Sequence, residues 1–186
     1  MKLKKSDHVT LVNEQDQVIG SMDKIEAHCG GGKLHRAISV FLFRRDKTGA
    51  LELLLQQRSD QKIVGARQWA NTVCGNVWPE ESYEECARRR LEFELNITQK
   101  IPLTDIFIFR YQVQCNQEFG ENEIDHIFVG WFDGKLKPNP EEVTATQWFA
   151  WERAKKLDKS VSNWSPWFKK MMQDSQVVNA LEKNAT

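Results

Sequence analysis

The sequence lacks the features that would direct it to a membrane or to nucleic acid. Its 186 residues carry no net charge, because 26 lysines and arginines balance 26 aspartates and glutamates. Neither a basic field for nucleic acid nor a polybasic patch for membranes is therefore expected. The longest apolar runs, such as Ala37–Phe43, fall far short of the roughly 20 residues that a membrane span needs. The lysine-rich start Met1–Asp7 is followed by no apolar stretch, so no signal peptide is expected.

Cysteine is scarce and scattered, which argues against a disulfide framework. The four cysteines form no CxxC pair and lie at Cys29, Cys74, Cys86 and Cys115. Without an export signal they are expected to be reduced thiols, and the cytoplasm is the expected location. Internal repeats and low-complexity linkers are also missing. Residues 1–186 are therefore predicted to form a single domain, which is large enough to bury its own core.

Short β-prone runs separated by turn residues predict a sheet. The first pair is His8–Val12 with Val18–Met22, and the second pair is His35–Phe43 with Leu51–Gln57. A polar loop rich in cations is expected between Arg58 and Gln68. Further strands are predicted at Trp69–Cys74, Asp105–Val113 and Ile124–Phe132, with another apolar segment ending at Trp148.

Helices are predicted in the middle and at the end of the chain. Glu81–Leu95 is charged and carries apolar residues at helical spacing, and Trp151–Leu157 is short enough for one or two turns. Ser165 and Pro166 are a typical N-cap and first residue for a helix over Trp167–Met172. The tail 173–186 is expected to be partly helical and frayed. This order of elements predicts an α+β layered domain.

The central helix carries the most specific pattern. Gly75, Glu81, Arg89 and Glu94 have the spacing of the Nudix box. Hydrolytic Nudix enzymes have metal-gathering glutamates at two positions that are Arg90 and Phe93 here. An arginine repels a metal cluster, but its guanidinium binds phosphate through two parallel hydrogen bonds. Taken alone, the stretch is also compatible with a charged helix that faces solvent.

Two histidines flank a glycine-rich segment. His28 and His35 enclose Gly30–Gly32, and both imidazoles could meet one metal if the glycines let the chain turn back. The glycines do not have the spacing of a phosphate-binding loop of the GxxxxGK[ST] type. Two histidines alone are equally compatible with incidental surface positions.

Two glutamates stand two residues apart near the start of a predicted strand. Glu121 and Glu123 should therefore point to the same face of the sheet. Two carboxylates on one face repel each other unless a cation or a proton neutralises them. The alternative is an ordinary polar hairpin tip.

Together these motifs, in this order, resemble the type 1 isopentenyl-diphosphate isomerases of the Nudix superfamily over nearly the whole chain. The resemblance rests on His28 with Leu34-His35, Asn71-Thr72-Val73-Cys74-Gly75, the altered Nudix helix, Arg110-Tyr111, Glu121-Asn122-Glu123 and Ser165-Pro166-Trp167. It implies a Nudix-like α/β/α sandwich with a mixed sheet and a central Nudix helix. It also implies an enzyme that interconverts isopentenyl and dimethylallyl diphosphate in isoprenoid biosynthesis.

The resemblance implies four catalytic residues. Cys74 and Glu123 would act on opposite faces of the isoprenoid, one delivering a proton and the other removing it. Tyr111 would hydrogen-bond Glu123, and Trp167 would place its π face near the developing tertiary cation. Core packing is the alternative explanation for Tyr111 and Trp167.

The resemblance also implies two metal ions and a set of phosphate-binding cations. His28, His35, Glu121 and Glu123 would bind a tightly held Mn²⁺, Mg²⁺ or Zn²⁺, and Glu94 would serve a Mg²⁺ that bridges to the diphosphate. The residues expected to contact the phosphates are Lys24, Arg58, Lys62 and Arg90. The prenyl diphosphate is the expected partner of a monomer or weak homodimer.

Three positions depart from the family pattern. Asn76 stands where a third histidine ligand is usual, and an amide oxygen suits zinc poorly compared with imidazole. Asn96 replaces a glycine, but asparagine tolerates the left-handed conformation at a helix end. Arg67-Gln68 replaces a common Pro-Gly pair in the loop expected over the diphosphate.

Two other functions compete with the isomerase. A Nudix hydrolase of a nucleotide or prenyl diphosphate would need the carboxylates that Arg90 and Phe93 replace. A non-catalytic protein that binds prenyl diphosphates would fit the loss of a ligand at Asn76, but Cys74 and Glu123 are both retained.

Overall fold

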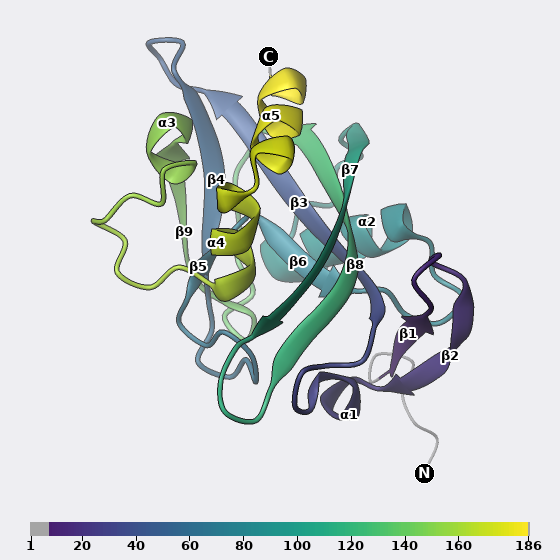
Figure 1. Cartoon of the computed structure of the whole chain (residues 1–186). Helices are drawn as coiled ribbons and strands as arrows, with labels where there is room; N and C mark the ends of the chain where they lie inside the picture. Colours follow the sequence, from purple (N-terminus) through teal and green to yellow (C-terminus); the bar gives the residue numbers. More distant parts are fainter. Residues whose placement is uncertain (1–7, 186) are drawn as a thin grey trace.

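A mixed β-sheet forms the middle of the fold in the computed structural model, which describes residues 8–185 (Figure 1). The lysine-rich segment Met1–Asp7 lies outside the described residues. Nine strands in the described range join in this sheet. They are β1 (His8–Val12), β2 (Val18–Asp23), β3 (His35–Arg45), β4 (Leu51–Arg58), β5 (Trp69–Ala70), β6 (Val73–Asn76), β7 (Leu103–Gln114), β8 (Gly120–Trp131) and β9 (Val143–Ala150).

Strand β3 organises the sheet, because it pairs with strands on both sides. It runs parallel to β8, with His35 opposite Glu123, and antiparallel to β6, with Ser39 opposite Cys74. Further along it pairs with β4, and at its start it touches β1. Its near-continuous apolar run fits a strand that is covered on both faces. The register of β3 thus brings together residues that are far apart in the sequence.

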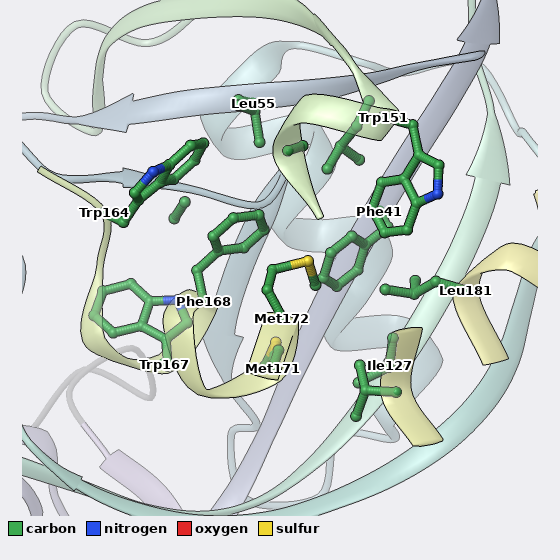
Figure 2. Close-up of a cluster of buried hydrophobic side chains, with 14 of the residues drawn as sticks. Phe41, Leu55, Ile127, Trp151, Trp164, Trp167, Phe168, Met171, Met172 and Leu181 are labelled. Atoms are coloured by element: carbon green, nitrogen blue, oxygen red, sulfur yellow. The ribbon is translucent and has the colours of Figure 1, made fainter. Parts of the chain in front are cut away.

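Helices cover both faces of the sheet (Figure 1). On one face, the side chains of β3 and β4 pack against α3 (Trp151–Ala154), α4 (Pro166–Gln173) and α5 (Ser175–Asn184) in a core rich in aromatic residues (Figure 2). On the other face lies α2 (Tyr83–Leu95), the predicted Nudix helix. Neighbouring side chains of β3, such as Phe41 and Leu42, enter different cores because successive residues of a strand point to opposite faces. The expected α/β/α arrangement of an α+β domain is confirmed.

The helix predicted at Glu81–Leu95 is confirmed as α2, although it begins two residues later, at Tyr83. The Ser82 hydroxyl accepts a hydrogen bond from the Glu85 amide, and the Glu85 carboxylate accepts one from the Ser82 amide. This reciprocal capping satisfies two amides that the helix leaves unpaired. At the other end Asn96 adopts the left-handed conformation with φ 55°. The expectation for Asn96 is confirmed.

The single strand predicted at Trp69–Cys74 is wrong. The chain pairs with β4 through β5, leaves the ladder at Asn71 and Thr72, and pairs with β3 through β6. The Thr72 hydroxyl accepts from the Leu42 amide at 2.8 Å and donates to the Leu54 carbonyl at 2.7 Å. Side chains thus replace the backbone bonds that a continuous strand would make.

The end of the chain forms a helix that packs on the core. Helix α5 runs to Asn184, and its Val177 and Leu181 are fully buried in the aromatic core. The prediction of a partly helical tail is therefore confirmed, while Thr186 lies outside the described residues. A short helix that the sequence did not predict, α1 (Lys24–His28), is capped by Asp23. None of the described helices has both the length and the apolar character needed to cross a membrane.

Candidate active site

One cavity of about 550 Å³ opens between the sheet, α1, α2 and α4. Nearly all of the residues predicted to form the site line it, and His35 and Glu94 are the exceptions. Those on the wall are Lys24, His28, Arg58, Lys62, Cys74, Asn76, Arg90, Tyr111, Glu121, Glu123 and Trp167. Their sources are strand β4, strands β6 to β8, helices α1, α2 and α4, and the loop that follows β4. The structure therefore gathers in one place residues spread over more than a hundred positions.

His28, His35 and Glu123 form a compact group of potential metal ligands. One donor atom from each lies within 4.8 Å of the others, and all three residues are buried. His28 Nδ1 lies 2.7 Å from the Lys24 carbonyl, and His35 Nδ1 lies 2.7 Å from the Lys33 carbonyl. A carbonyl can only accept, so each Nδ1 carries a hydrogen, and Nε2 is the ring nitrogen left to bind a metal. Such second-sphere bonds orient histidines that bind metals.

The glycine segment makes this approach possible. Gly32 has φ +77°, and a Cβ built on it would lie 2.9 Å from the Gly120 carbonyl oxygen. The Gly30 amide donates to the Glu118 carbonyl at 2.7 Å, so the segment packs on the hairpin between β7 and β8. The chain does turn back between His28 and His35, as the sequence suggested.

Asn76 lies among these three ligands with its amide nitrogen facing them. Its Nδ2 is 3.0 Å from His35 Nε2 and 3.3 Å from Glu123 Oε1. Those two acceptors lie only 3.2 Å apart, a separation that requires a proton or a cation nearby. The hydrogens of the Asn76 amide supply part of that compensation. Burial and the neighbouring His35 lower the pKa of His28 to about 4, so its imidazole is neutral and able to bind a metal.

Tyr111 connects Glu121 and Glu123 through one hydroxyl. Its oxygen lies 2.9 Å from Glu121 Oε2 and 2.5 Å from Glu123 Oε2. A phenol has a single hydrogen, so one of the two contacts needs a proton from a carboxyl group. Burial and the charge of Glu123 raise the pKa of Glu121 to about 8, which identifies it as the protonated partner. Burial acts to raise the pKa of Glu123, but contacts with His35 and Tyr111 outweigh it and lower that pKa.

Cys74 lines the cavity from β6. Burial raises the pKa of its thiol to about 12, so the sulfur keeps its proton at neutral pH. Its Sγ lies 3.1 Å from Asn71 Oδ1 and 3.9 Å from the hydroxyl oxygen of Ser39. The next residue, Gly75, allows α2 to pack closely, because a Cβ there would lie 2.6 Å from Arg90 Cγ.

Trp167 stands in the first turn of α4 and is 2% exposed (Figure 2). The guanidinium carbon of Arg58 lies 5.0 Å from the centre of one of its rings, and Arg58 also donates to the Val64 carbonyl at 2.9 Å. The indole therefore already contacts one cation through its π electrons. Trp167 belongs to the aromatic core and also lines the cavity, so the same side chain packs in the core and forms part of the pocket.

The four predicted cations and Arg89 line the cavity, and an unpredicted carboxylate lies among them. Glu142 Oε2 accepts from Arg90 at 2.7 Å and also pairs with Lys62. Incomplete hydration and repulsion from Lys62, Arg90 and Arg58 lower the pKa of Lys24 to about 8, although much of its side chain is exposed. Glu142 precedes β9 in a polar stretch, and no sequence motif distinguishes it from neighbouring glutamates.

Glu94 lies behind this cluster and does not line the cavity. Its side chain is fully buried, with Arg90 Nε 2.7 Å from Oε1 and Gln56 Nε2 2.8 Å from Oε2. Both oxygens are thus engaged by protein groups.

Sequence reasoning also missed Ser39 and Asp125. Asp125 continues the alternation of Glu121 and Glu123 along β8 and therefore faces the same side of the sheet. It accepts a hydrogen bond from the Ser39 hydroxyl at 2.8 Å. Burial, together with Glu123, raises its pKa well above the usual range. The two-residue spacing from Glu123 could have identified Asp125 in the sequence, whereas no sequence pattern distinguishes Ser39 from other serines.

Comparison with known proteins matches this arrangement to one family. The NUDIX domain model matches residues 33–168. Isopentenyl-diphosphate Delta-isomerase 1 of Aromatoleum aromaticum is 41% identical over 150 residues, covering 80% of this chain and 81% of that protein. The isopentenyl-diphosphate Delta-isomerase of Aliivibrio fischeri is 36% identical over 184 residues, covering 94% and 99%. The chain belongs to the isopentenyl-diphosphate Delta-isomerase family.

Solved structures of other proteins share the fold of this chain. A protein from Deinococcus radiodurans aligns with a TM-score of 0.69 and 19% identity, covering 89% of this chain and 97% of that one. The MutT protein from Methanosarcina mazei aligns with a TM-score of 0.59 and 19% identity, covering 82% and 96%. At these identities the match concerns the Nudix fold alone.

Proposed function

We propose that this enzyme interconverts isopentenyl diphosphate and dimethylallyl diphosphate by protonation and deprotonation. The observation that carries the proposal is a cavity whose wall holds both a half-buried thiol and a buried carboxylate pair, with cations beside them. Close relatives that bear the isomerase name support the same reaction.

The proposed substrate enters with its diphosphate among the cations. Arg58, Lys62, Arg90 and Lys24 supply positive charge, and guanidinium groups bind phosphate oxygens through paired hydrogen bonds. Glu142 forms ion pairs with Lys62 and Arg90, so the diphosphate would compete with it for their hydrogens. The charge of Glu142 also keeps two like-charged side chains close together.

The proposed proton donor is the Cys74 thiol and the proposed acceptor is the Glu123 carboxylate. In the forward direction the S–H bond of Cys74 breaks as a C–H bond forms at the terminal alkene carbon, which leaves a tertiary cation. A C–H bond beside the cation then breaks, its proton passes to Glu123, and its electron pair forms the new double bond. The raised pKa of Cys74 and the lowered pKa of Glu123 support this assignment, because the first keeps its proton and the second is ionised.

Tyr111 and Trp167 would support the two proton transfers. Tyr111 donates to the carboxylate oxygen of Glu123 that lies away from His35, and so holds the acceptor in one orientation. Trp167 supplies an electron-rich ring on the wall of the cavity, where it would stabilise the tertiary cation. Unactivated alkenes are weak bases, so this positioning and the exclusion of water matter more than acid strength.

We further propose that the reaction depends on divalent metals. The two lone pairs on His28 and His35 Nε2, beside a Glu123 oxygen, fit a Mn²⁺, Mg²⁺ or Zn²⁺ ion, with Asn76 and Glu121 as the remaining candidates. Such an ion would supply positive charge that stabilises ionised Glu123. Glu94 is the proposed carboxylate for the Mg²⁺ that accompanies the diphosphate, and it would have to release Arg90 or Gln56 to bind that ion.

A hydrolase is disfavoured by the contacts of Arg90. This arginine stands where the hydrolytic enzymes have a glutamate, and it forms ion pairs with Glu94 and Glu142. The carboxylates around the diphosphate site are thereby neutralised by protein cations.

Incubation of the protein with isopentenyl diphosphate in deuterated water tests the proposal. Mg²⁺ is present first, and Mn²⁺ or Zn²⁺ is then added. Deuterium in dimethylallyl diphosphate is the expected result. Release of free phosphate would show hydrolysis instead, and binding of unchanged substrate would indicate a non-catalytic protein.

A further inference from the structure

Asn71 is a fully buried polar side chain that contacts the reactive thiol, and the reaction proposed above gives it no part. It lies where the chain passes from β5 to β6, and its side chain is not exposed to solvent. Asparagine at such a position must satisfy two hydrogen-bond donors and one acceptor oxygen. Where those groups point determines what the residue does.

The orientation of the Asn71 amide is determined by two backbone carbonyls. Its Nδ2 donates to the Val73 carbonyl at 2.9 Å and to the Val40 carbonyl at 3.2 Å. A carbonyl oxygen only accepts, so the amide cannot rotate by 180° without turning its own oxygen onto two others. Val40 and Val73 are paired in the β3–β6 ladder, next to the pair of Ser39 and Cys74. The strand pairing that places the thiol therefore also anchors the amide.

The oxygen of this anchored amide faces the sulfur of Cys74. Oδ1 lies 3.1 Å from Sγ, and an amide oxygen has no hydrogen to give, so the sulfur is the donor. The other polar neighbour of the sulfur is Ser39, whose oxygen lies 3.9 Å away. The Ser39 hydroxyl is bonded to the Asp125 carboxyl group at 2.8 Å, and its oxygen lies farther from the sulfur than Asn71 Oδ1 does. Asn71 is thus the acceptor to which the S–H bond points.

We propose that Asn71 is a positioning residue, whose anchored amide oxygen accepts a hydrogen bond from the Cys74 thiol and holds the sulfur and its proton in one orientation. A thiol otherwise rotates freely about its Cβ–Sγ bond, and proton transfer to carbon needs the reacting atoms aligned. The consequence for turnover rests on the proposed isomerase activity, whereas the hydrogen bond itself does not.

Infrared spectroscopy of the S–H stretch tests the hydrogen bond directly in the wild-type protein. The difference between wild type and Cys74→Ser isolates the band of this thiol from those of the other three cysteines. We expect the band at lower frequency than that of butanethiol in hexane, and we expect Asn71→Ala to shift it upward. A wild-type band at the frequency of an unbonded thiol would overturn the proposal, whether or not the variant folds.

Steady-state kinetics separate positioning from general support of the fold. Asn71→Ala is expected to lower kcat about tenfold, the effect of losing about one hydrogen bond, while KM changes less than about twofold. Thr72→Val is the matched control, because Thr72 is equally buried and its hydroxyl serves only the Leu42 amide and the Leu54 carbonyl.

The control should lose stability but keep its kcat per folded molecule. Equal losses of kcat in the two variants would assign Asn71 a merely structural role and overturn the proposal. If the wild-type protein does not isomerise the substrate, the proposed function fails alone, because the S–H band decides the hydrogen bond without turnover.

Discussion

The two ends of the cavity are built from different kinds of structure. The acidic end holds Glu121 and Glu123 at alternate positions of β8, with Tyr111 opposite Glu123 in the β7–β8 ladder. The cationic end takes Lys24 from α1, Arg90 from α2 and Lys62 from a loop, with Glu142 between the last two. The pairing of the strands fixes where the acidic side chains lie. The positions of the cationic groups depend instead on the conformations of long side chains.

This difference matches the demands of the two halves of the proposed reaction. Proton transfer loses rate when reacting atoms move by about an ångström, so its groups benefit from a rigid sheet. Diphosphate binding tolerates adjustment, because charge attraction falls gradually with distance. We therefore expect changes at the acidic end to lower kcat, and changes at the cationic end to act mainly on KM and its pH dependence.

The largest effects are expected from Cys74→Ala and Glu123→Gln. Each removes one proton-transfer group, so kcat should fall by about a thousandfold or more while the fold remains intact. Deuterium incorporation into dimethylallyl diphosphate measures the rate, and circular dichroism checks the fold. Cys86→Ala is the matched control, because Cys86 is buried in α2 and does not line the cavity. Near-normal rates in either variant would exclude the two-sided mechanism.

The acidic end was largely predictable from the sequence because it depends on local alternation. Glu121 and Glu123 stand two residues apart, which places them on one face of any strand, and Tyr111 joins them through the predicted neighbouring strand. The left-handed cap at Asn96 was predictable for the same reason, since one residue and its position decide it.

The remaining parts of the site depend on contacts distant in sequence. Glu142 approaches Arg90 because β9 pairs with β4 and the Asn139 amide donates to the Glu94 carbonyl of α2. Ser39 approaches Asp125 through the parallel pairing of β3 with β8. The break between β5 and β6 was missed because Thr72 serves the backbone of two other strands. Propensity and periodicity contain no information on such partners.

Asn76→His should produce an intermediate effect at the acidic end. A third imidazole beside His28 and His35 is expected to tighten Zn²⁺ or Mn²⁺ binding about tenfold, since each additional nitrogen ligand suits these ions better than an amide. Isothermal titration with each metal measures the affinity. Asn96→His is the matched control, because it places the same side chain at the left-handed end of α2, outside the cavity lining. An unchanged affinity in Asn76→His would mean that position 76 does not contact the metal.

The smallest effect is expected from the titration of Lys24 at the cationic end. Its pKa of about 8 means that the ammonium group is charged below pH 8 and loses its charge as the pH rises through that value. Because the charge favours diphosphate binding, kcat/KM should be highest below pH 8 and decline above it. The decline should be about fivefold, as expected for a partly exposed ion pair worth up to about 1 kcal/mol.

Lys24→Arg tests the origin of this decline, because a guanidinium group stays charged throughout the range. The variant should keep a flat kcat/KM through pH 8 to 9, whereas Lys24→Met should show the lower value at every pH. A decline that persists in Lys24→Arg would instead implicate Glu121, whose raised pKa is also about 8. In that case the acidic end would control the pH dependence as well as the chemistry, and the proposed division between the two ends would not hold.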